Sequence, residues 1–207
     1  FHMVNMRPFT AFEQKNLKFL VNHNVKFTQV EITPTGLGKG ILDSTAPMRA
    51  YFLENGIHNY EGQLQGQEHK QIKQACILTD ATQFFTKASF YRPNTKKGDP
   101  RMWIYGLGAH TDDNDIHVLF WHEQTLYSIN ISHIDIEKCY DSVLITPMQE
   151  ILKEINKEGN SVSEELLGRF RAVKDQWFES EVTADTGIGR TIESFLGISM
   201  NSDKTPD

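Results

Sequence analysis

Basic side chains are concentrated in one stretch of the chain, residues 87–105. This stretch holds five basic residues and one acid, a net charge of +4, whereas residues 111–141 hold seven acids and one base. Arginine can donate two parallel hydrogen bonds to guanine, aspartate can accept from the amino group of cytosine, and asparagine can read adenine, each worth about 1–3 kcal/mol of discrimination. A basic edge beside an acidic remainder suits a protein that binds DNA on one side. The candidate DNA-binding residues are Lys87, Arg92, Asn94, Lys96, Lys97, Asp99 and Arg101.

A second candidate DNA contact is the glycine-rich run PTGLGKG at residues 34–40. Glycine lets a backbone adopt positive φ or approach a base closely, and Lys39 adds a positive charge. A surface hairpin without a ligand is the alternative, and the basic stretch at residues 87–105 favours the binding interpretation. We expect a loop here, with Thr35, Gly36, Gly38, Lys39 and Gly40 as its DNA-binding residues.

Two further groups of side chains have structural explanations. His110, Asp112, Asp113, Asp115, His117 and His122 could suggest a metal site. Their spacing matches no zinc pattern, so we expect a solvated acidic turn and no metal. The aromatic residues Trp103, Tyr105, Phe120 and Trp121 could stack on bases. Within the strands of a small barrel, however, we expect such rings in the core.

The elements that must position these residues are mostly short strands. Residues 25–32 alternate apolar and polar side chains, and short apolar runs recur at residues 75–78, 84–91, 102–107, 116–121 and 126–131. Helical spacing predicts helices at residues 10–21 and 48–55, the latter capped by Ser44 or Thr45. Several strands with one helix inserted early predict a mainly β fold with short helices, an open barrel of about seven strands.

From residue 147 onward the apolar residues take helical spacing. They predict two helices, divided by a turn at residues 158–161, with Ser163 as the cap of the second helix. A length of 207 residues with 39% hydrophobic side chains allows one core domain and a helical extension. We therefore expect the barrel at residues 1–145 and a helical connector at residues 146–207.

Composition excludes several classes of protein. The formal net charge of −6 argues against indiscriminate binding of nucleic acid. Cys76 and Cys139 have neither CxxC nor zinc spacing, which favours a reduced intracellular protein over a disulfide scaffold. No apolar run approaches the length of a signal peptide or a membrane span, so we expect no membrane partner.

The order of elements over residues 25–132 resembles the DNA-binding pseudobarrel of plant B-three transcription factors and of EcoRII-like effector domains. The run TGLGKG lies where that family has an amino-terminal recognition arm, and residues 87–108 match its carboxy-terminal arm. The resemblance implies that two arms grip the major groove. It makes Arg101 and Asp99 base readers, and Lys87, Lys96 and Lys97 phosphate contacts, because an ammonium carries little directional information. Arg92 and Asn94 are candidates from their chemistry alone.

The end of the chain carries a second resemblance. The run TGIGRTIESFLGI at residues 186–198, followed by Pro206 and Asp207, resembles the entry to the catalytic core of MvaI/BcnI-type restriction endonucleases. In that family a later Glu and Lys complete a metal-binding triad. The resemblance makes Asp207 the first of three catalytic groups, and one carboxylate alone cannot hold a catalytic Mg²⁺. We expect Mg²⁺ to serve the full-length nuclease, no cofactor for DNA binding, and no cleavage by these 207 residues.

Together the two resemblances imply a monomeric, cytoplasmic, prokaryotic restriction endonuclease of type IIE. Its effector domain would bind double-stranded DNA at CCWGG and control a downstream nuclease allosterically. Two alternatives stay open. The upstream segment could be only structural, in which case charge reversal in the arms would leave DNA affinity unchanged. It could instead bind single strands or RNA through its aromatic residues.

Overall fold

The computed structural model describes residues 6–179, apart from the side chains of Lys96 and of residues 173–179. The chain divides into two compact units, residues 1–156 and residues 157–207. The first unit includes the start of the last helix. A domain boundary at residue 145 stays a prediction. In the described part, no helix is long and apolar enough to cross a membrane.

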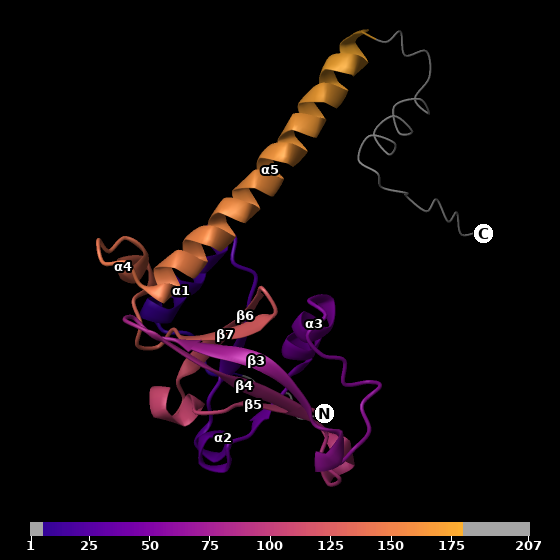
Figure 1. The fold of residues 1–207 in the computed structure, drawn as a ribbon, viewed down its shortest axis with the longest axis vertical. Helices are drawn as coiled ribbons and strands as arrows, with labels where there is room; N and C mark the ends of the chain where they lie inside the picture. Colours follow the sequence, from indigo (N-terminus) through magenta and orange to yellow (C-terminus); the bar gives the residue numbers. More distant parts are fainter. Residues whose placement is uncertain (1–5, 180–207) are drawn as a thin grey trace, which may run out of the picture. The chain divides into compact units, whose positions relative to one another are not determined.

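Within residues 6–179, seven strands form one curled, open sheet (Figure 1). The order across the sheet is β1-β6-β7-β3-β4-β5-β2, and all neighbours are antiparallel except β3 and β7. The expected fold class, mainly β with helices in an open barrel, is therefore confirmed. The strands are β1 (Thr28–Glu31), β2 (Leu42–Asp43), β3 (Gln71–Leu78), β4 (Gln83–Tyr91), β5 (Arg101–Ile104), β6 (Ile116–His122) and β7 (Thr125–Asn130).

Helices cover both faces of the sheet. Ile77 of β3 packs in a cluster with Phe52 of α3, whereas its neighbour Leu78 packs in a second cluster with Leu20 of α1. Successive side chains of a strand point to opposite faces, so the central strands are buried on both sides. The helices are α1 (Ala11–Asn22), α2 (Pro34–Lys39), α3 (Ala46–Glu54), α4 (Ile136–Tyr140) and α5 (Pro147–Glu179), with 3-10 turns η1 (Gln67–His69), η2 (Lys96–Gly98) and η3 (Leu107–His110).

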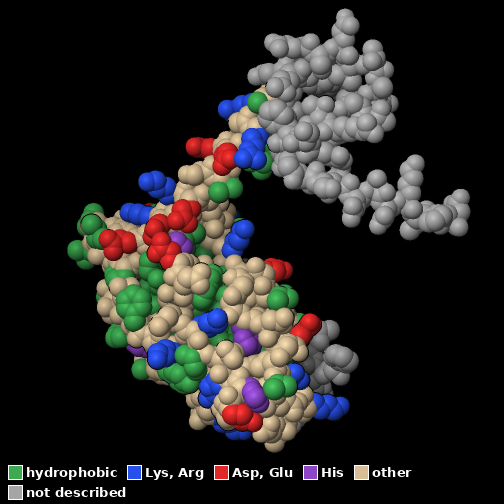
Figure 2. Space-filling view, turned by 45° about the vertical axis from the view of Figure 1, so that its right-hand side comes forward, with side chains coloured by type: hydrophobic (Ala, Val, Ile, Leu, Met, Phe, Trp, Pro, Cys, Tyr) green, Lys and Arg blue, Asp and Glu red, His purple; other side chains and the backbone are tan. Residues whose placement is uncertain are grey.

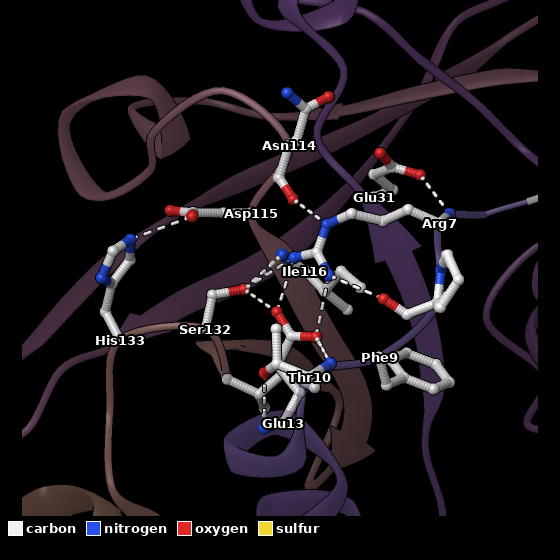
Figure 3. Close-up of polar contacts among 12 residues, drawn as sticks. Arg7, Phe9, Thr10, Glu13, Glu31, Asn114, Asp115, Ile116, Ser132 and His133 are labelled. Atoms are coloured by element: carbon white, nitrogen blue, oxygen red, sulfur yellow. Dashed lines mark hydrogen bonds and ion pairs between the residues drawn. The ribbon is translucent and has the colours of Figure 1, made fainter.

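One buried carboxylate, that of Glu13, ties the first helix to the sheet (Figure 3). Glu13 closes a capping box with Thr10 at the start of α1. It also accepts hydrogen bonds from both terminal nitrogens of Arg7 and, at 2.7 Å, from Ser132 Oγ just beyond β7. The hydrogen bonds from Arg7, and then those from Ser132 and the Thr10 backbone, outweigh burial and lower the pKa of Glu13 to about 2.

The glycine-rich run at residues 34–40 is a short helix, α2, and the expectation of a loop is wrong. Thr33 caps α2, with its side chain accepting from the Gly36 backbone, and Pro34 occupies the first turn. Gly40 ends the helix in the left-handed region at φ 61°. A hydroxyl cap, proline at the start and glycine at the end are strong helix boundaries, and together they outweigh the low helix propensity of Gly36 and Gly38.

The two helices expected after residue 147 are one continuous helix, α5. Ser163 does not cap a second helix, because its hydroxyl donates to the Gly159 carbonyl at 3.0 Å inside α5. Ser161 makes the same kind of bond to the carbonyl of Lys157. A single glycine in a helix costs about 1 kcal/mol relative to alanine, which is too little to break a helix with good helix formers on both sides.

Candidate nucleic-acid interface

Two candidate arms each lead into one strand of the β2–β5 pair. We call residues 33–41, which precede β2, the amino arm, and residues 92–100, which precede β5, the carboxy arm. The pairs Leu42↔Met102 and Asp43↔Arg101 join β2 to β5. The Ser44 backbone N–H then donates to the Pro100 carbonyl at 2.9 Å. The structure thus pairs two strands that lie far apart in the sequence, and because the pair is antiparallel the amino arm enters it beside Trp103 and the carboxy arm beside Ser44.

A buried tyrosine stabilises this junction from inside the barrel. Tyr60 donates its hydroxyl to the Arg101 carbonyl at 2.9 Å and shares a 2.7 Å hydrogen bond with Ser44 Oγ. Burial raises the pKa of the Tyr60 phenol well above its usual value, so the hydroxyl keeps its proton. Tyr60 therefore holds the residue that follows β2 and the residue that begins β5 to the same point of the core.

The glycines of the amino arm have different roles. A Cβ on Gly36 would lie 2.7 Å from the Ile41 carbonyl oxygen, and one on Gly40 would lie 3.5 Å from the Trp103 ring. Gly36 thus lets the arm pack on itself, whereas Gly40 suits the positive φ of 61° and would make only ordinary contact with β5. Gly38 is exposed, with nothing within 4 Å of its Cβ position. Of the residues predicted here, Thr35, Gly38 and Lys39 are exposed and available to a ligand.

Arg92 is an internal brace of the carboxy arm. Its Nε donates to the Gly98 carbonyl at 2.8 Å and its Nη1 to the Gln63 carbonyl at 3.1 Å. The guanidinium is half-buried, and two of its nitrogens donate hydrogen bonds within the protein. Arg92 therefore reaches across the arm rather than out of it. Around it the predicted residues Asn94, Lys97 and Asp99 are exposed, as is Lys87 on β4.

Arg101 is the first residue of β5 and directly follows the carboxy arm. Its side chain is 16% exposed and its Nε is 3.7 Å from Asp43 Oδ1, whereas the Asp43 side chain is 72% exposed. Among the described residues, Arg101 Nε is a buried nitrogen without a hydrogen-bond partner. An Nε buried in this way cannot meet an acceptor at the surface, so a base contact would use the terminal nitrogens of the guanidinium. Figure 2 shows Lys and Arg side chains, in blue, over the lower part of the first unit.

The acidic segment after η3 is partly buried, which corrects the expectation of a solvated turn. Asp115 is 6% exposed and accepts from Asn130 Nδ2 at 2.7 Å. His117 is fully buried, with Ser128 Oγ 2.8 Å from Nδ1 and Thr111 Oγ1 3.0 Å from Nε2. Burial lowers the pKa of His117 to about 4, so the ring is neutral at pH 7. The alternating strand places His117 inward, where hydroxyl partners satisfy it.

His133 is a member of this cluster that sequence reasoning missed. Its Nε2 lies 2.9 Å from Asp115 Oδ1 and 3.5 Å from Asp112 Oδ2. No spacing pattern links a residue beyond β7 to a turn before β6. Asp112 and Asp113 are exposed, as expected for that part of the turn. Among the described residues, two groups have ligand atoms within 4.8 Å of one another, namely Asp112, Asp115 and His133, and His122, Glu123 and Glu154.

The aromatic residues divide between core and surface. Phe120 is 1% exposed and stacks on Tyr127, and Trp103 and Trp121 pack half-buried against the first cluster. Tyr105, expected in the core, is 41% exposed because it lies just beyond the end of β5. Phe84 and Phe85 of β4 are 44% and 68% exposed, and the sequence analysis did not single them out.

A comparison with protein families finds a match at the end of the chain. Residues 167–207 match the model of the MvaI/BcnI restriction endonuclease family. This match supports a type II restriction endonuclease, a class of enzyme whose substrate is DNA. Among curated proteins and solved structures, nothing matches the chain. The matched segment includes the run at residues 186–198 and Asp207, which lie outside the described residues.

Proposed function

We propose that the first unit is the sequence-specific effector domain of a type IIE restriction endonuclease and binds double-stranded DNA through both arms. The observation that carries this proposal is the antiparallel β2–β5 pair, which joins the two strands that the amino and carboxy arms lead into. Lys39 and Lys97 are exposed on the two arms. Two basic arms on a rigid sheet suit a major groove about 12 Å wide.

The residues of the arms suit different parts of the duplex. Lys39, Lys87 and Lys97 are exposed ammonium groups that would neutralise phosphates, and Lys96 is assigned the same role from its position in the sequence. Arg101 and Asp99 are the proposed base readers. Thr35, Gly38 and Asn94 are exposed on the arms, whereas Gly36, Gly40 and Arg92 shape the arms.

The target and the regulatory role come from resemblance. An EcoRII-like barrel ahead of an MvaI-like nuclease resembles the monomeric type IIE enzyme UbaLAI, which supports CCWGG as the target. In this arrangement a second copy of the site acts as an allosteric effector that controls the downstream nuclease. The family match at residues 167–207 supports the nuclease part of this architecture.

DNA hydrolysis by the complete enzyme is proposed to need Mg²⁺, whereas DNA binding by the arms is proposed to need no cofactor. Asp207, the residue that the resemblance assigns to the metal site, lies outside the described residues.

A second candidate function is binding of single strands, and one observation favours it. Phe84, Phe85 and Tyr105 are all more than two-fifths exposed, and exposed rings can stack on unpaired bases at about 1–3 kcal/mol per base. Phe84 already contacts the His110 ring in a tilted arrangement, with ring centroids 4.6 Å apart. Phe85 is the more available of the two.

Binding of labelled duplexes at fixed salt tests the proposal. We expect a duplex containing CCWGG to bind more tightly than single-site variants, and more tightly than either of its single strands. Equal affinity for cognate and scrambled duplexes would contradict sequence-specific binding. A preference for the single strands would favour the second candidate.

A further inference from the structure

A third segment, not predicted as a DNA contact, is built into the carboxy arm. Residues 62–70, here called the glutamine loop, run beside the arm through a parallel bridge between Gln65 and Arg92. The Gly66 backbone N–H donates to the Arg92 carbonyl at 2.8 Å, and Arg92 Nη1 donates back to the Gln63 carbonyl. The same guanidinium also holds Gly98. Arg92 therefore joins the loop and the arm into one surface.

The glutamine loop is anchored to the core by Gln63. This residue is 8% exposed, and its Nε2 donates to the carbonyls of His69 and Phe90, each at 2.9 Å. Its Oε1 lies 3.0 Å from His58 Nε2. Every polar group of the Gln63 carboxamide is thus paired, which fixes the loop backbone on both sides of Gln65. A side chain on such a support is held in place before a ligand binds.

The side chain of Gln65 lies directly over the turn of the carboxy arm. A Cβ added to Gly98, whose φ is 72°, would lie 2.7 Å from both Cγ and Cδ of Gln65. Glycine suits the positive φ at this position, and a larger residue there would displace the end of the Gln65 side chain. Gln65 itself is exposed, as are Lys97 and Asp99, the two residues that flank Gly98 in the sequence. Its carboxamide therefore stands at the surface of the proposed DNA interface.

We propose that Gln65 is a specificity-determining residue that reads an adenine in the major groove. The inference rests on the proposed function, binding of CCWGG by the arms. A carboxamide offers one donor and one acceptor, which match adenine N7 and N6. Guanine presents two acceptors, N7 and O6, so the same carboxamide is mismatched there. The central pair is the only A·T pair of CCWGG, and Gln65 is assigned to it.

The test compares Gln65→Ala with wild type on duplexes that carry an A·T or a G·C pair at the centre of the site. Gln14→Ala, an exposed glutamine on α1, is the matched control. We expect wild type and control to prefer the A·T centre by about 10-fold, consistent with one bidentate pair. Gln65→Ala should bind both centres alike and keep its discrimination at the four outer pairs, with an unchanged melting temperature.

The outcomes separate this inference from the proposed function. If wild type binds CCWGG specifically but Gln65→Ala keeps the preference for the A·T centre, the assignment of Gln65 is wrong. The assignment of Gln65 is also wrong if wild type binds the A·T and the G·C centre equally well. If wild type does not distinguish CCWGG from scrambled duplexes at all, the proposed function itself fails. A loss of discrimination at every pair would make Gln65 a general support of the arm and also overturn the assignment.

Discussion

Asp43 and Arg101 face each other across the β2–β5 pair, and the carboxylate oxygen of Asp43 lies 3.7 Å from Nε of Arg101. Asp43 ends the segment that begins with the amino arm, and Arg101 follows the carboxy arm. The exposed carboxylate has little burial cost, whereas the largely covered guanidinium depends on it for orientation. This pair links the strand that follows the amino arm to the strand that follows the carboxy arm.

Arg101→Ala should change specificity, whereas Lys97→Ala should change affinity. A bidentate arginine discriminates at one base pair, so its removal should relax the preference there, by about 5-fold or more. Lys97 is an exposed phosphate candidate, and its loss should weaken all duplexes together and lower the slope of log affinity against log salt by about one unit. Titrations at several salt concentrations measure both. Equal losses on cognate and random duplexes for Arg101→Ala would contradict its role as a base reader.

Substitutions at two glycines of the amino arm should have unequal effects on stability. Gly36→Val places a side chain against the Ile41 carbonyl at 2.7 Å, so the arm must move and the melting temperature should fall. Gly38→Val meets open space in a helical turn and should cost about 1 kcal/mol or less. If Gly38 faces the bases, its substitution should still damage binding. Unchanged cognate affinity for Gly38→Val would remove that position from the interface.

Two phenylalanines should differ in their contribution to stability. Phe120 is 1% exposed between the sheet and its helices, so Phe120→Ala should cost about 3–5 kcal/mol. Phe27 is only half-buried at the edge of the second cluster, and Phe27→Ala should cost less. Chemical denaturation of the two variants measures the difference. A larger loss for Phe27→Ala would contradict the packing of the second cluster.

Stability should fall in acid through Glu13. Its pKa in the folded protein is about 2, below the usual value of 4.5, so the unfolded state binds the proton more tightly. The stabilisation is therefore present above about pH 4.5 and is lost as pH falls towards 2. Denaturation of wild type and Glu13→Gln between pH 7 and pH 3 measures this contribution. The two curves should converge in acid, and a constant gap would contradict the assignment.

Predictions from the sequence were correct where they rest on the pattern of residues within one element. Residues 28–31 alternate buried and half-buried side chains as the pattern predicted, and Thr10 and Glu13 form a capping box at the start of α1. Where neighbouring signals compete, prediction failed. Three glycines suggested a loop, but Thr33 and Gly40 cap a helix.

The parts that depend on distant residues could not be predicted. The parallel pairing of β3 with β7 joins strands separated by three others in the chain, and no local pattern encodes it. His133 reaches Asp115 from beyond β7, and Gln65 reaches the carboxy arm through Arg92. Arg92 was predicted from its charge as a DNA contact. Its hydrogen bonds to two backbone carbonyls depend on where the glutamine loop folds.

The central claim is that the two arms bind the duplex together, and charge reversal in both arms tests it most directly. The variant Lys39→Glu with Lys97→Glu changes one exposed residue in each arm, and Lys18→Glu with Lys138→Glu makes the same change in net charge on α1 and α4. Fluorescence anisotropy with a CCWGG duplex at fixed salt measures affinity, and thermal melting checks the fold. We predict at least about a 100-fold loss for the arm variant and a much smaller change for the control, since contacted phosphates are repelled only in the first case. Equal affinities for the two folded variants would contradict the account.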